Sequence, residues 1–255
     1  MRLRPFFKRY GSKHRLAPKY PKPIYDILTE TYAGSAQIAT LYYNKQVVLA
    51  EYDSDLYQLW DWLINVATPN DIKSLPFDLI PGTDIRTLDI HYGAKVLIRQ
   101  WQRVGRCGCW TVSKWNNANS GFWSKSTRDA IAAQVSQIKH WHLLSSAEEL
   151  FEMFRDIPCT HFIDPPYQLQ ANVYGTPPID YKKLGDICRT LKGQVIVCEQ
   201  PGADWLPFEP LAENTVGRTK QGGTRARRTE MIWHFINTSN LAVETAPERK
   251  VVLSA

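Results

Sequence analysis

The residues best suited to chemistry are Asp164-Pro165-Pro166-Tyr167, which follow the apolar run Thr160-His161-Phe162-Ile163. That run lies between prolines and predicts a buried strand. Hydrogen bonds from an exocyclic amine to the Asp164 carboxylate and the Pro165 carbonyl would free the amine lone pair from its ring. The prolines add no competing N–H donor, and Tyr167 provides a face on which a flipped-out base can stack. The four residues predict a pocket for an amine-bearing base; the alternative is a strand-to-loop turn with a capping Asp.

A second stretch predicts the first half of a nucleotide-type binding unit. It consists of a strand over 24–30, a turn of small residues over 31–37 and a helix from Ala36 to about Asn44. Gly34 lets the backbone approach a ligand closely. The next strand, Gln46–Ala50, ends at Glu51, about twenty residues after Glu30, where an acid is suited to hold ribose hydroxyls.

Asp53 is the alternative acid for the ribose. For Asp55 we expect a capping role, at the start of a helix that begins near Leu56.

The amino terminus adds the pattern Phe-Lys-x-x-Gly-x-Lys over residues 7–13. The order of this segment, the turn at Gly34, the acid at Glu51, a long insert and the quartet at 164–167 resembles the class-alpha DNA adenine methyltransferases, the Dam-like enzymes of bacteria and phages. The resemblance covers roughly residues 4–60 and 140–200. One departure is Ala36, where the family usually has a second glycine; we expect the small alanine to be tolerated.

The resemblance implies transfer of a methyl group from S-adenosyl-L-methionine (AdoMet) to the N(6) amine of adenine in double-stranded DNA, leaving S-adenosyl-L-homocysteine. Catalytic residues implied by it are Asp164, Pro165, Pro166 and Tyr167. Residues implied to bind the cofactor are Tyr10, Lys13, Glu30, Tyr32, Ala33, Gly34, Ser35, Ala36, Glu51, Ser145 and Asp164. Ser145 or Ser146 is also expected to cap the helix 147–155. We expect base flipping and direct in-line transfer, without a metal, because the amine becomes acidic once methylated.

Charge and aromatic residues point to a DNA partner. The chain carries a net charge of +6, with basic residues concentrated before Asp26 and around 218–228. Between Trp101 and Arg128, aromatic residues alternate with basic residues and amides, which can read bases or fill the gap left by a flipped base. The expected DNA contacts are Arg9, Arg103, Arg106, Lys114, Asn116, Asn117, Trp123, Lys125, Arg225, Arg227 and Arg228.

The alternative for the 101–128 segment is a small packed subdomain with a tryptophan core. Both interpretations can hold, and we expect two of its four tryptophans to be buried. Trp60 and Trp62 are expected in the core.

These patterns predict an α/β fold of the Rossmann-like, AdoMet-dependent methyltransferase type. We expect a mixed, mostly parallel seven-stranded sheet with helices on both faces. The catalytic domain would comprise 1–60 and 140–236, the helical target-recognition insert 61–139 and a tail 237–255. Further helices are expected over 56–67, 89–103 and 179–191, strands over 194–198 and 230–236, and a loop over the active site at 168–178.

Composition sets the remaining expectations. Five cysteines without a regular framework favour reduced thiols in a cytoplasm, that of a bacterium or a phage-infected cell. Cys107 and Cys109 are too few ligands to predict zinc, and Cys159 is expected in the core. No window predicts a membrane span or signal peptide, and a monomer is expected. Other possibilities are methylation of cytosine N(4) or of RNA adenine, and a non-catalytic DNA-binding module of the same fold.

Overall fold

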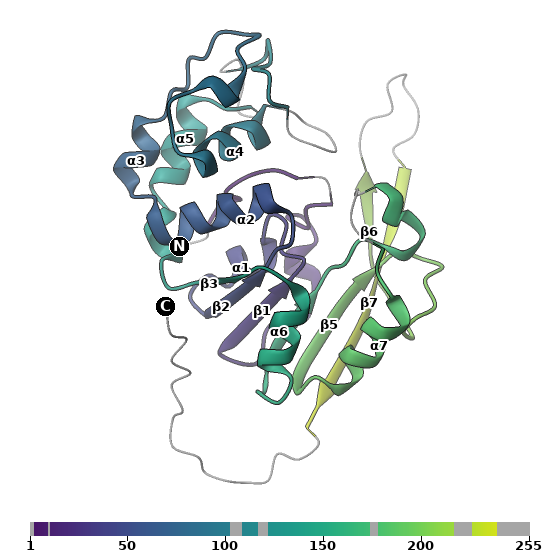
Figure 1. Cartoon of the computed structure of the whole chain (residues 1–255). Coiled ribbons are helices and arrows are strands. Elements are labelled where there is room, and N and C mark those ends of the chain that lie inside the picture. Colours follow the sequence, from purple (N-terminus) through teal and green to yellow (C-terminus); the bar gives the residue numbers. More distant parts are fainter. Residues whose placement is uncertain are drawn as a thin grey trace.

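The computed structural model describes residues 3–9, 11–102, 109–116, 122–173, 178–216 and 226–238, and gives the backbone alone for 171–173, 213–216 and 226–228. One seven-stranded sheet runs through the described chain in the order β3-β2-β1-β4-β5-β7-β6 (Figure 1). The strands are β1 (Ile27–Thr31), β2 (Gln46–Ala50), β3 (His142–Leu144), β4 (Cys159–Ile163), β5 (Gly193–Glu199), β6 (Glu209–Val216) and β7 (Ala226–Asn237). The predicted α/β class and mixed seven-stranded sheet are confirmed.

The strand order and directions indicate where a ligand site is expected. The strands β1 to β5 are parallel to one another, whereas β7 is antiparallel to both β5 and β6. From β1 the chain moves outward to β2 and β3, then returns to pair β4 with the other side of β1. Ligands of such sheets bind beyond the carboxyl ends of the strands where the order reverses. Here that point lies between β1 and β4.

Helices cover both faces of the sheet (Figure 1). They are α1 (Gln37–Leu41), α2 (Ser54–Asp61), α3 (Pro69–Ser74), α4 (Tyr92–Trp101), α5 (Lys125–Ala132), α6 (Ala147–Phe154) and α7 (Tyr181–Thr190). Alternate strand residues face opposite sides, so Leu28 and Leu49 join the core under α1 and α2, while Val48 and Val197 join the core under α6 and α7. Among the described helices, none is long and apolar enough to cross a membrane.

The helices α3, α4 and α5 gather beyond α2, away from the sheet (Figure 1). The core under α1 and α2 continues into this insert without a break. A Cβ at Gly93 would lie 2.5 Å from Trp62 Cβ, so only glycine allows α4 this close to the π-helical turn η2 (Trp62–Val66) that extends α2. Trp60 and Trp62 are buried, as predicted.

Several element boundaries differ from prediction. β2 matches its predicted bounds, but β1 starts at Ile27 because the residues before it form no ladder. The strands β3 and β6 and the helices α3 and α5 were not predicted. The predicted cap was wrong as well, because Asp53 caps α2 by accepting from the backbone N–H groups of Asp55 and Leu56. Asp55 instead binds Tyr92 and Arg99 of α4.

Candidate functional site

The turn after β1 has an unusual backbone. Tyr32, Gly34 and Ala36 have left-handed φ angles of 59°, 51° and 44°. Only glycine adopts such angles without cost, so Ala36 occupies a position that favours the glycine expected from the resemblance. Two hydrogen bonds hold Gly34: its N–H donates to Glu51 Oε2 over 2.7 Å, and its carbonyl accepts from the Trp60 indole over 2.8 Å. Strain in such a turn persists only where its surroundings fix it, as they do at many functional sites.

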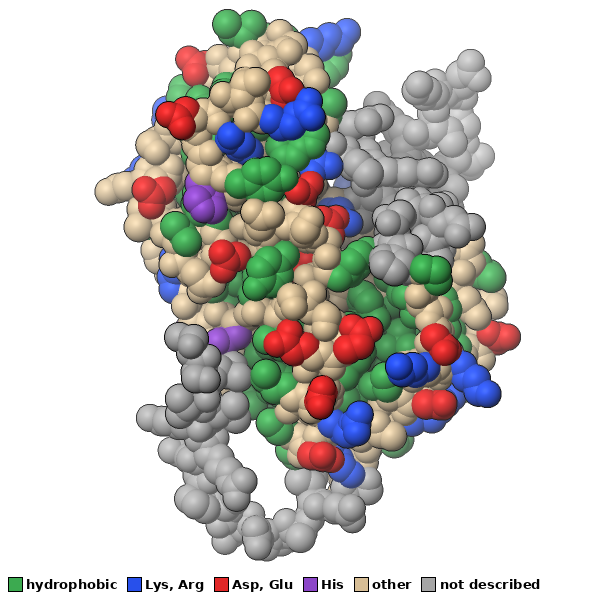
Figure 2. Space-filling view, in the orientation of Figure 1, with side chains coloured by type: hydrophobic (Ala, Val, Ile, Leu, Met, Phe, Trp, Pro, Cys, Tyr) green, Lys and Arg blue, Asp and Glu red, His purple; other side chains and the backbone are tan. Residues whose placement is uncertain are grey.

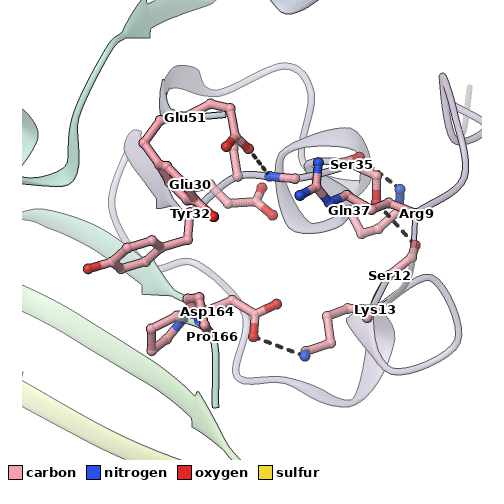
Figure 3. Close-up of a pocket in the computed structure, with 15 residues that line it drawn as sticks. Arg9, Ser12, Lys13, Glu30, Tyr32, Ser35, Gln37, Glu51, Asp164 and Pro166 are labelled. Carbon is pink, nitrogen blue, oxygen red and sulfur yellow. Dashed lines mark hydrogen bonds and ion pairs between the residues drawn. The ribbon is translucent and has the colours of Figure 1, made fainter. Parts of the chain in front are cut away.

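Two buried carboxylates lie beside this turn. Glu30, on β1, accepts from the backbone N–H groups of Ile38 and Ala39 at the start of α1. Burial raises the pKa of Glu30 to about 8 against the lowering effect of those bonds. Burial also raises the pKa of Glu51, which accepts from the N–H of Asp53 as well as of Gly34. Both carboxylates line one pocket (Figure 3).

The opposite wall of this pocket is formed by Asp164, Pro165 and Pro166, at the carboxyl end of β4 (Figure 3). Asp164 forms an ion pair with Lys13, at 2.9 Å. Burial raises the pKa of Asp164 to about 6, while the Lys13 ammonium opposes the rise. The Tyr181 hydroxyl donates to the Pro166 carbonyl over 2.6 Å and so fixes the wall from α7.

Tyr167 is not among the residues that line the pocket. Its hydroxyl accepts from Lys13 and donates to Glu230, which fixes the ring next to these two side chains. Stacking of a base on Tyr167 stays a prediction.

A second, more apolar cavity of about 340 Å³ adjoins the first. The two share Tyr32, Tyr52 and Pro166, and α6 and α7 line the rest of the second cavity. The second cavity combines apolar side chains of α6 and α7 with three charged ones, those of Glu148, Asp180 and Lys183. Small-molecule sites commonly enclose about 300–1,000 Å³ and combine an apolar lining with few polar groups.

The structure brings together most of the predicted cofactor residues. Seven of them besides Asp164 line the charged pocket: Lys13, Glu30, Tyr32, Ala33, Gly34, Ser35 and Glu51. Ala36, in the same turn, is buried and does not line the pocket, and Tyr10 lies outside the described residues. Ser145 does not line either cavity; it binds Glu149, and Ser146 caps α6. Of the two acids considered for a ribose, Glu51 lines the charged pocket, whereas Asp53 lines neither cavity.

The residues predicted to contact DNA differ in their exposure and hydrogen bonding. Trp123 is fully buried and its indole donates to the Pro76 carbonyl, which leaves it no surface for DNA; we reassign it to the core of the insert. The Asn116 amide is bound to the Phe77 and Leu79 carbonyls. Lys114 and Lys125 are exposed. Arg103, Arg106, Asn117 and Arg225, and the side chains of Arg227 and Arg228, lie outside the described part.

Tryptophan burial agrees with the expectation for the insert. Trp101 and Trp123 are buried, whereas Trp110 is half-buried and Trp115 is 52% exposed. On the face shown in Figure 2, acidic and basic side chains of the described residues are interspersed. The described part of that face therefore offers DNA no continuous basic patch.

Several residues that line the pocket were not predicted to do so. Arg9, expected at DNA, lines the pocket and pairs with Asp53 at 3.0 Å. Ser12, Gln37 and Tyr52 also line it. Tyr52 could have been found, because it follows Glu51 at the end of a strand. Gln37 gave no comparable signal, since its position depends on the left-handed turn before it.

Among the described residues, no group of three or more His, Cys, Asp or Glu side chains is placed to hold a metal ion. Cys159 is buried, as predicted. Comparison with models of known protein families finds no match, and no curated protein matches the sequence significantly.

Proposed function

We propose that this protein transfers a methyl group from AdoMet to the N(6) amine of adenine in double-stranded DNA. The observation that carries the proposal is that the quartet's Asp164, Pro165 and Pro166 line the same pocket as Glu30, Gly34 and Glu51. These residues come from three strand ends at the reversal point of the sheet, where a shared ligand site is expected.

The chemistry of the pocket fits the cofactor. AdoMet carries a sulfonium and an ammonium, and three carboxylates line this pocket, those of the buried Glu30 and Glu51 and of the half-buried Asp164. Glu30 would hold the ammonium, Glu51 the ribose hydroxyls, and the turn at Gly34 would pass close to the methionine part. The adjoining apolar cavity between α6 and α7 would take the adenine ring. When bound, the sulfonium supplies an electrophilic methyl group.

The protein's own contribution would be orientation and exclusion of water. The Asp164 carboxylate would accept a hydrogen bond from the target amine and turn its lone pair toward the methyl group. The rigid Pro165-Pro166 backbone, fixed by Tyr181, would keep the adjacent carbonyls in place. The residue type at 164 favours adenine over cytosine, since the resemblance implies Ser more often in enzymes that act on cytosine.

The test is methylation of unmethylated genomic DNA by the purified protein with AdoMet, followed by sequencing that detects modified bases. We expect N(6)-methyladenine in the wild-type reaction and none with Asp164→Ala. Calorimetry should show that Asp164→Ala still binds AdoMet, which separates loss of chemistry from loss of fold.

Other outcomes would redirect the assignment. Modified cytosine, or activity on RNA alone, would replace the substrate. AdoMet binding without any transfer would favour a non-catalytic DNA-binding module, and absence of AdoMet binding would refute the proposal.

A further inference from the structure

Beside Lys13 and Asp164, which line the pocket, lie three polar side chains from distant parts of the chain, and the five form one largely buried cluster. Lys13 Nζ lies 2.9 Å from Asp164 Oδ1, 2.5 Å from the Tyr167 hydroxyl and 3.4 Å from Glu230 Oε1. The hydroxyls of Tyr20 and Tyr167 donate to the same Glu230 oxygen, over 2.6 and 2.7 Å. The ammonium of Lys13 thus donates to Asp164 and to Tyr167 and faces Glu230 as an ion pair.

This arrangement affects the role proposed for Asp164. Its Oδ1 oxygen accepts from Lys13, which leaves Oδ2 to accept from the target amine. In a buried site, an ammonium this close would oppose the positive charge that the amine acquires during methylation. Methyl transfer would therefore be favoured if Lys13 moved away from Asp164 when the base enters.

We propose that Glu230 is a positioning residue for methyl transfer, which takes over the Lys13 ammonium when the target amine binds Asp164. This role rests on the proposed function. Glu230 Oε1 is already 3.4 Å from Nζ. A movement of about 0.5 Å would give a normal charge-assisted hydrogen bond, so Lys13 can change partners without leaving the cluster.

The charges of the cluster support this exchange. One ammonium faces two carboxylates, those of Asp164 and Glu230. The neighbouring hydroxyls of Tyr20 and Tyr167 stay neutral, because burial raises the pKa of each well above its ordinary value. The cluster therefore has one negative charge in excess, which favours a cation forming at the target amine. Without Glu230, Lys13 would neutralise Asp164 permanently.

The same arrangement predicts a pH effect that a merely structural role would not produce. Charged and titratable groups from every neighbouring element interact with Asp164: Lys13, Tyr20, Glu30, Tyr167, Cys198, Glu199 and Glu230. Among them Glu230 raises the pKa of Asp164, whereas Lys13 lowers it. Removal of the Glu230 charge should therefore lower the pKa of Asp164.

The experiment compares Glu230→Gln with Tyr20→Phe. Glutamine keeps an oxygen for both tyrosine hydroxyls, and Tyr20→Phe removes one hydrogen bond to Glu230 without changing a charge. For Glu230→Gln we expect single-turnover methylation about 10- to 100-fold slower, with AdoMet affinity within about twofold of wild type. The acidic limb of its pH–rate profile should move to lower pH, while the limb of Tyr20→Phe stays in place.

A measurement that needs no DNA accompanies the kinetics. In protein labelled with ¹³C-aspartate, the carboxyl signal of Asp164 should titrate at lower pH in Glu230→Gln than in wild type. Wild-type turnover in Glu230→Gln, or slow turnover without movement of either titration, would overturn the role of Glu230. An inactive wild type would instead refute the proposed function, and with it any role of Glu230 in turnover.

Discussion

The ionisation of Glu30 gives the sharpest test of the proposed cofactor site. Burial raises its pKa to about 8, so at neutral pH most of this side chain is protonated in the empty protein. A cationic cofactor group held by Glu30 requires the ionised form. Between pH 6 and 7.5, AdoMet affinity should therefore rise with pH, by up to tenfold or about 1.4 kcal/mol per unit. Above about pH 8 the gain should stop, because the α-amino group of the cofactor loses its own charge.

The assay is isothermal titration calorimetry of AdoMet binding at several pH values, in buffers with different ionisation enthalpies. Wild type should release protons on binding. Asp164 and Glu51 also have a raised pKa and contribute to the slope, so the contribution of Glu30 is the difference between wild type and Glu30→Gln. An equal slope in both proteins would refute the link between Glu30 and the cofactor.

The same shift affects the stability of the empty protein. The folded state binds a proton at Glu30 that the unfolded chain has lost above its ordinary pKa of 4.5. The contribution of protonated Glu30 to stability is therefore complete below about pH 4.5 and is lost as the pH rises through about 8. Thermal denaturation of Glu30→Gln should lack this part of the pH dependence.

Three further predictions concern stability and reactivity. A left-handed φ costs an alanine about 1–2 kcal/mol, and glycine in a folded chain costs about 0.5–1 kcal/mol of entropy. Ala36→Gly should therefore leave the unfolding free energy unchanged or raise it by up to about 1.5 kcal/mol; a clear decrease in urea denaturation would contradict the strain at this turn. Trp123→Ala should lower the unfolding free energy by about 3–5 kcal/mol, whereas Trp115→Ala should change it by less than about 0.5 kcal/mol, and equal effects would contradict their placement. Burial raises the pKa of the Cys159 thiol, so iodoacetamide should not modify it until the protein is unfolded. Mass spectrometry measures this modification, and a modified Cys159 in the native protein would show that β4 opens readily.

Local patterns predicted the strands that make the site. Val47, Val48 and Leu49 form a continuous apolar run, and β2 has the predicted bounds. β6 gave no such signal, because it is an edge strand interrupted by Pro210 with a register shift beside it. β3 has only three residues, too few for a periodic pattern.

The part of the site that sequence could not predict depends on contacts between distant segments. The resemblance placed Lys13 near the cofactor, but nothing near position 230 marks Glu230 as its partner, since only the pairing of β5 with β7 brings it there. The prediction of a DNA contact for Trp123 was wrong for a similar reason. Its basic neighbours indicated DNA, while its burial is decided by packing against the segment that contains Pro76.

The shared core has a consequence for protein engineering. α2 and η2 form one helical run from Ser54 to Val66, so a graft junction between residues 60 and 61 would cut through it. The Trp60 indole holds the Gly34 turn, and the Trp101 indole of the insert donates to the Phe6 carbonyl in the amino-terminal segment. A transplant of the insert into another scaffold would have to carry α2 and the amino-terminal segment with it. The insert and the pocket of this chain therefore depend on the same packing and cannot be exchanged independently.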